Sequence, residues 1–168
     1  MNQINISFNP IEDRLLLRIN AGEKELMDEY LFWLTRRLVK MLFPLLDKLL
    51  EADMDLLTQV SGANRKAVIE FQKEEALLKT DFKTPYVANP KNTPFGKLPL
   101  LISKVQAAKT PDGKQLLSFI TVTDKRISLF INSQLIHSIK KLLSDGIKKA
   151  GWDIEQTSVL MAKPEKLI

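Results

Sequence analysis

Residues 30–52 read YLFWLTRRLVKMLFPLLDKLLEA, and residues 127–149 repeat the pattern of this stretch 97 positions later. Each copy opens with a short apolar run that is typical of a strand. Thr35 and Asn132 then supply side chains that cap helices, and apolar residues follow at helical spacing. The coinciding apolar positions are Leu38, Val39, Leu42, Leu45, Leu46 and Leu50 in the first copy and Leu135, Ile136, Ile139, Leu142, Leu143 and Ile147 in the second. We interpret the stretch as part of an internal repeat.

Two further strands are predicted upstream of each copy. In the first half, residues 4–8 and 15–19 alternate apolar and polar side chains on either side of an Asn-Pro break, which predicts a hairpin. In the second half, residues 98–108 and 115–123 predict a hairpin around the turn sequence TPDG. The order strand, strand, strand, helix is therefore expected twice.

Local features refine this order. Residues 21–29 are expected to be a charged connection around Gly22. Pro44 lies well inside the first helix, where it removes a backbone donor, so a kink or a break is expected there. Gly151 is expected to end the second helix, with Trp152 covering the end of the core.

These elements predict an α+β fold of tandem duplicated β-β-β-α units, with antiparallel sheets, helices on one side and a pseudo-twofold axis between the units. One helix cannot cover three strands alone, so the units should bury each other. Either the helices occupy a shared inner side or the two sheets join into one. A dimer of the whole chain would extend this arrangement.

The predicted domain organisation has four parts. They are a first unit with an extra helix over residues 1–79, a proline-rich linker over residues 80–99, a second unit over residues 100–152 and a tail over residues 153–168. The linker contains Phe82, Tyr86 and Phe95, so we expect a strap that is partly ordered.

Composition narrows the class of protein. The 168 residues are 45% apolar and 27% charged, with net charge +5 and no cysteine, so disulfides and thiolate chemistry are excluded. The positive excess lies entirely in residues 97–168, a pattern that is compatible with nucleic acid binding but is also common in soluble proteins. Residues 1–10 have neither a basic nor an apolar region, and no apolar run reaches membrane length, so we expect a cytoplasmic protein that is neither secreted nor membrane-spanning.

No constellation for catalysis can be assembled from the sequence. His137 is the only histidine, and its position off the apolar stripe predicts a surface residue. The six glycines are isolated, so neither a phosphate loop nor a dinucleotide fingerprint is available. The sequence therefore predicts no enzyme, no cofactor and no metal site.

The strand alternation predicts aromatic side chains on the outer side of the sheet. Trp33 and Phe130 are equivalent outward positions in the two copies, and Arg14 and Arg18 share the outward side of the neighbouring strand. Aromatic platforms flanked by cations suit single-stranded nucleic acid, because bases stack on the rings and phosphates bind the cations. Arg36-Arg37, in the first turn of a helix, could hold a phosphate. The alternative is that both aromatics pack beneath the other copy, a dimer partner or the strap.

The tandem sheet-then-helix organisation is similar in outline to the Whirly and PUR-type single-stranded nucleic-acid-binding folds. Those units have four strands per copy, whereas three are counted here. The resemblance implies a binding protein. We therefore expect a non-enzymatic protein that binds single-stranded DNA or RNA through Arg14, Arg18, Trp33, Arg36, Arg37 and Phe130. The alternative is a cytosolic protein–protein adaptor or assembly factor, and a homodimer is expected under either hypothesis.

Overall fold

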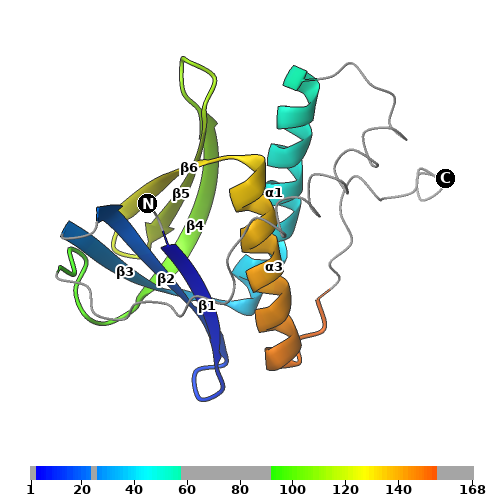
Figure 1. Cartoon of the computed structure of the whole chain (residues 1–168). Coiled ribbons are helices and arrows are strands. Elements are labelled where there is room, and N and C mark those ends of the chain that lie inside the picture. Colours follow the sequence, from blue (N-terminus) through cyan, green and yellow to red (C-terminus); the bar gives the residue numbers. More distant parts are fainter. Residues whose placement is uncertain (1–2, 24–25, 58–91, 155–168) are drawn as a thin grey trace.

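The described residues form six strands and two helices. The structure, a computed structural model of the whole chain, describes residues 3–23, 26–57 and 92–154 (Figure 1). The elements in chain order are β1 (Gln3–Asn9), β2 (Arg14–Glu23), β3 (Leu26–Leu34), α1 (Arg36–Leu57), β4 (Leu100–Lys109), β5 (Gln115–Thr121), β6 (Arg126–Ile131) and α3 (Ser133–Ala150). This is the predicted order, and the extra helix predicted before residue 79 lies outside the described residues.

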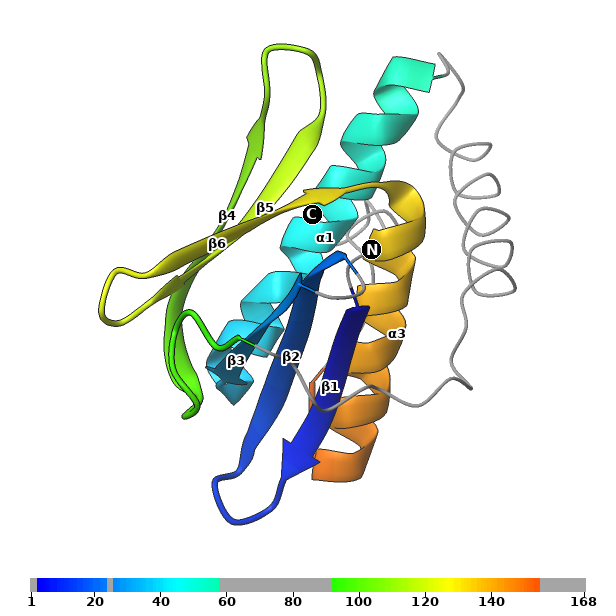
Figure 2. The same ribbon diagram turned by 60° about the vertical axis from the view of Figure 1, so that its left-hand side comes forward.

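All six strands belong to one sheet in the order β1-β2-β3-β4-β5-β6. Pairing is antiparallel within β1–β3 and within β4–β6, whereas β3 and β4 pair in parallel through Phe32 with Leu100 and Trp33 with Leu101. Figure 2 shows that β4–β6 are turned relative to β1–β3, so the sheet bends at this short junction. The protein is α+β with one open, mostly antiparallel sheet, which is the joined-sheet alternative.

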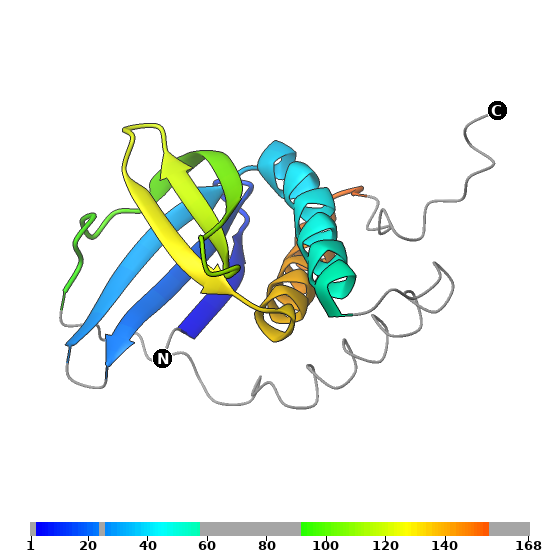
Figure 3. The same ribbon diagram turned by 90° about the horizontal axis from the view of Figure 1, so that it is seen from above.

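Both helices lie side by side on one side of the sheet (Figure 3). α1 contacts β4, α3 contacts β1, and the two helices contact each other. At Gly146, α3 approaches the sheet so closely that an added Cβ atom would lie 3.1 Å from a methyl carbon of Leu15. The glycine therefore permits the close packing of α3 against the sheet.

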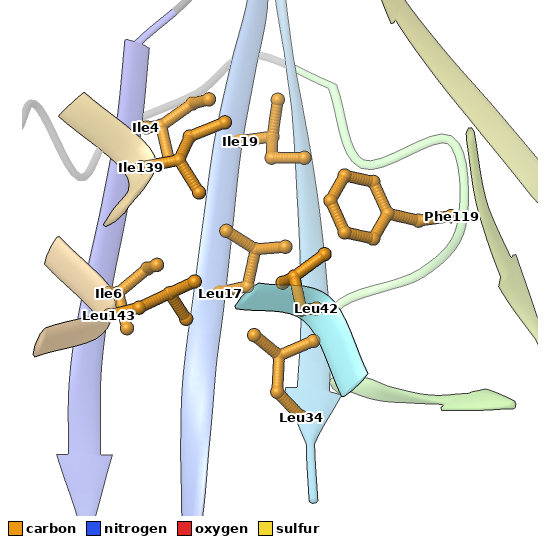
Figure 4. A pocket seen from close by; sticks show the side chains of 9 residues that line it. All are labelled: Ile4, Ile6, Leu17, Ile19, Leu34, Leu42, Phe119, Ile139 and Leu143. Atoms are coloured by element: carbon orange, nitrogen blue, oxygen red, sulfur yellow. The ribbon is translucent and has the colours of Figure 1, made fainter. Parts of the chain in front are cut away.

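One apolar core runs between the sheet and the helices through both halves of the chain. Phe32 of β3 stacks on Phe119 of β5, with ring centroids 6.4 Å apart. Figure 4 shows the centre of the core, where side chains from both helices and four strands surround a space of about 10 Å³. This space has room for at most one water molecule, so it is a packing defect and too small for a ligand.

The predicted helix ends are confirmed. The Thr35 hydroxyl oxygen accepts the Leu38 N–H at 3.2 Å, and the Asn132 side-chain oxygen accepts the Leu135 N–H at 2.8 Å. Gly151 ends α3 with a left-handed φ of 67°, a conformation that glycine adopts without steric cost.

Trp152 covers the end of the core, as predicted. Its ring packs edge-on against Phe8, and its indole N–H donates to Asp13 Oδ1 at 2.9 Å. Trp152, two residues after the end of α3, is therefore held against the β1–β2 hairpin by both an apolar contact and a hydrogen bond.

The predicted charged connection over residues 21–29 is wrong. β2 continues to Glu23, β3 begins at Leu26, and Asn20 lies directly opposite Glu29. The charged side chains favoured the prediction of a loop. The pairing of β2 with β3 is held by backbone hydrogen bonds, however, and these form whether or not the side chains are charged.

Pro44 does not break α1, which is continuous from Arg36 to Leu57. Pro44 and Lys40 are both exposed. The Lys40 carbonyl, which loses its helical donor to the proline, therefore lies on the solvent side where water can donate to it.

His137 is buried, with 3% of its surface exposed, so the prediction of a surface residue is wrong. It lies one turn before Lys140, whose ammonium group pairs with Asp47 of α1. Periodicity located only the side of α3 that faces the sheet. His137 and Lys140 lie one turn apart on the same side of α3, and this side of the helix is therefore not wholly exposed.

The described end of the linker packs against β3. The Asn92 carbonyl accepts the Glu29 N–H at 2.9 Å, and the Phe95 ring meets Tyr30 edge-on at 4.9 Å. Burial, with a smaller contribution from Asp28, raises the pKa of the Tyr30 phenol above its usual value. Phe95 thus docks as expected, whereas Phe82 and Tyr86 lie outside the described residues.

Candidate nucleic-acid interface

The outer face of the sheet is the side opposite the helices (Figure 3). Strand alternation places on it the residues between the buried ones, such as Leu16 between Leu15 and Leu17, and Trp33 between Phe32 and Leu34. Neither of the two described helices covers this side. The predicted site residues of the strands all fall on it.

An apolar row crosses the outer face at the β3–β4 junction. Leu16 pairs with Trp33, Trp33 pairs with Leu101, and Val122 donates its backbone N–H to the Leu101 carbonyl at 3.0 Å. The first three side chains are partly exposed, and Val122 is 58% exposed. We call Leu16, Trp33, Leu101 and Val122 the apolar band.

Two arginines flank the band on β2. Arg14 and Arg18 lie two residues on either side of Leu16, and each is partly exposed. Arg18 is a diagonal neighbour of Trp33, a separation that a long side chain can reach. Among the described residues neither arginine forms an ion pair, and Nε of Arg18 is buried without a hydrogen-bond acceptor.

Arg36 and Arg37 lie at the same end of β3 as Arg14. They are exposed in the first turn of α1, which contains no acidic residue. Leu15, the neighbour of Arg14, pairs with Leu34, two residues before Arg36. Arg14, Arg36 and Arg37 therefore lie at the same end of the sheet, where β2 and α1 begin.

Phe130 lies far from Trp33. It is 61% exposed on β6 opposite Leu116, with the Lys114 ammonium 5.5 Å from its ring centroid. Leu116 is six residues along β5 from Val122 of the apolar band, which corresponds to about 20 Å. Both aromatics are on the outer face, but the structure does not bring them together.

The charge of the outer face is one-sided. Among the described outward side chains of the strands, the only carboxylate belongs to Glu29, which is 7% exposed and faces Asn20 across the ladder. The exposed charge there is positive, which favours an anionic ligand.

Sequence reasoning missed Leu101 and Val122. They join the band only because β3 and β4 pair in parallel, and that pairing comprises two residue pairs. The alternation of Leu101 with Ile102 was the only available signal, and it gives no information on which strand lies next to β4.

The described residues provide no metal site and no membrane-spanning element. No group of three or more potential metal ligands occurs among them. Within the same residues, neither helix combines the length and apolarity that crossing a bilayer requires.

Comparison with known proteins finds no match. This holds for protein-family models, for curated proteins and for solved structures. The resemblance to Whirly and PUR-type folds is therefore not confirmed.

Proposed function

We propose that the protein is a non-enzymatic, cytoplasmic binding protein that holds single-stranded DNA or RNA on the outer face of its sheet. A base stacks on Trp33, and phosphates contact Arg14 and Arg18, with Arg36 and Arg37 extending the cationic surface. The supporting observation is that Trp33 lies in an apolar band between arginines that form no described ion pair, on a face whose only described outward carboxylate is buried.

The energetics fit this assignment. Base stacking on an aromatic side chain contributes roughly 1–3 kcal/mol per base, and every base can stack, so little sequence preference is expected. Phosphate contacts add a salt-dependent term through counterion release. Arg18 is partly exposed as a residue, so its guanidinium group can take part in such contacts.

Titration of labelled oligothymidylate and oligouridylate at several salt concentrations tests the proposal. Wild-type affinity should fall steeply with salt, and Trp33→Ala should weaken binding by roughly 1–3 kcal/mol. Trp33→Phe should retain most of the affinity because it keeps a ring. Met41→Ala is the control, since Met41 is 61% exposed on α1, away from the outer face.

Circular dichroism of each variant should match the wild type, because Trp33 packs on the surface of the sheet and outside the core. Absence of binding by the wild-type protein at low salt would refute the proposal. Equal losses for Trp33→Ala and Met41→Ala would refute the assigned face.

A protein partner is the second candidate. The apolar band runs across β2, β3 and β4 to Val122 in the turn after β5, and Leu98 near the start of β4 is 79% exposed. Exposed apolar patches of this kind are typical of surfaces that a partner covers. The partner could be a second copy of the chain, which would give a homodimer. Light scattering tests it, because a dimer through this face should dissociate in Trp33→Asp and remain intact in Met41→Asp.

We also propose that the two halves of the chain are a duplicated β-β-β-α unit. The two helices begin 97 residues apart, at Arg36 and Ser133. Each contacts the first strand of the other half, α1 with β4 and α3 with β1. Such reciprocal contacts are what a pseudo-twofold relation between two β-β-β-α units requires.

A further inference from the structure

A β-bulge on β4 places a lysine on the outer face. The β4–β5 register shifts between Ile102 and Lys104, and the intervening Ser103 donates its hydroxyl to the Ile120 carbonyl at 3.2 Å. Ile102 faces the core, so regular alternation would direct Lys104 inward as well. The extra residue turns Lys104 outward, where it is exposed.

The bulge aligns Lys104 with a second cation. Lys104 pairs with Ile120 of β5, and Ile120 pairs with Arg126 of β6, so the two cations lie on either side of one apolar side chain. Arg126 is exposed, and its guanidinium donates to Gln106 Oε1 at 3.3 Å. Within the described residues neither cation forms an ion pair, including with Asp124 of the adjoining turn.

This cation pair lies across the apolar band from Arg18. β3 and β4 are parallel, so moving from Leu101 to Lys104 follows the direction from Trp33 towards α1. Arg18 pairs with Leu31, in the opposite direction along β3. The band therefore has positive charge on both of its long sides.

We propose that Lys104 and Arg126 form a second phosphate-binding subsite for a single nucleic-acid strand that crosses the apolar band. The inference rests on the proposed function. One base stacks on Trp33, phosphates on one side contact Arg18, and phosphates on the other side contact Lys104 and Arg126. The partner is identified by charge complementarity, because a polyanion with stacking bases satisfies both the cations and the band between them.

The test uses the double variant Lys104→Ser/Arg126→Ser in the full-length protein. The matched control is Lys48→Ser/Lys148→Ser, which removes the same charge from exposed positions on α1 and α3. Binding of labelled oligothymidylates of increasing length is measured at several salt concentrations. All four positions are exposed, so unfolding midpoints should stay at the wild-type value.

The subsite variant should lose about tenfold in affinity for long oligonucleotides at low salt, and its salt slope should fall by about 0.7 for each phosphate that the variant no longer neutralises. The shortest oligonucleotides that still depend on Trp33 should bind the variant and the wild type equally, because they do not reach β6. Lys104→Arg/Arg126→Lys should keep the wild-type slope, since it retains both charges.

Three outcomes overturn the inference. Equal losses in the subsite variant and the helix control would show that only net charge matters. Unchanged affinity and slope in the subsite variant, with a loss in Trp33→Ala, would remove the second subsite and leave the proposed function in place. Failure of the wild-type protein to bind at low salt would refute both the second subsite and the proposed function.

Discussion

Asp47 of α1 and Lys140 of α3 form an ion pair between the two helices. Asp47 is almost fully buried, and the Lys140 ammonium lies 2.5 Å from its Oδ1. Lys140→Met would leave a buried carboxylate without this partner, so we expect a loss of about 2–4 kcal/mol in the free energy of unfolding. Urea denaturation followed by circular dichroism measures the loss.

The neighbouring residue provides the control. Lys141 pairs with Asp145 at 2.9 Å, but both side chains are 44% exposed, and exposed pairs of this spacing contribute little. Lys141→Met should change stability by less than about 0.5 kcal/mol. If the two variants lose equal stability, burial of the Asp47 pair is not what makes it strong.

At the level of single residues, the sequence predicted outward side chains well where the strand was regular. Alternation alone places Trp33 and Phe130 on the side away from the core, and Phe130 is indeed exposed. Lys104 could not be placed in this way, because a bulge shifts the alternation by one residue and no glycine or other signal marks Ser103. The burial of His137 was missed because it arises from tertiary packing, of which the periodicity of one helix gives no sign.

The packing of α3 against the sheet depends on Gly146 at the scale of the element. An added Cβ would lie 3.1 Å from Leu15, so Gly146→Val would force the helix outward or Leu15 out of its rotamer. We expect a loss of about 1–3 kcal/mol in the free energy of unfolding. Thermal and urea denaturation measure it.

Lys149→Val is the matched control for this element, because Lys149 is exposed near the end of the same helix. It introduces the same β-branched side chain and should stay within about 0.5 kcal/mol of the wild type. A destabilisation equal to that of Gly146→Val would point to the helix propensity of valine, and the close approach to Leu15 would then not be the cause.

Element ends were predictable where a side chain caps the helix, as Thr35 and Asn132 do. They were not predictable where composition and backbone pairing disagree. β2 and β3 extend through a charged region, and α1 continues through Pro44. In these cases tertiary packing outweighs local preference, since α1 buries Leu42 and Leu46 on either side of the proline.

At the scale of the whole molecule, the sequence predicted α+β structure and the order of elements but left the joining of the sheets open. The junction consists of Phe32 with Leu100 and Trp33 with Leu101. A contact of two residue pairs between strands far apart in the chain has no local signature, since any partly buried apolar strand end could make it. The apolar band could not be predicted for the same reason, because it forms only where β3 and β4 pair.

Because only two residue pairs join β3 to β4, we expect the apolar core, and not the sheet, to make β1–β3 and β4–β6 unfold together. Phe119 of β5 stacks on Phe32 of β3, and both are buried. Phe119→Leu should destabilise the protein by about 1–2 kcal/mol, and native-state hydrogen exchange should show the same loss of protection at Leu17 in β2 and Leu129 in β6. Phe130→Leu, the same change on the outer face, should leave both unchanged because Phe130 is outside the core. If Phe119→Leu lowers protection only in β4–β6, the halves open independently, and the apolar band would come apart at its centre whenever one of them does.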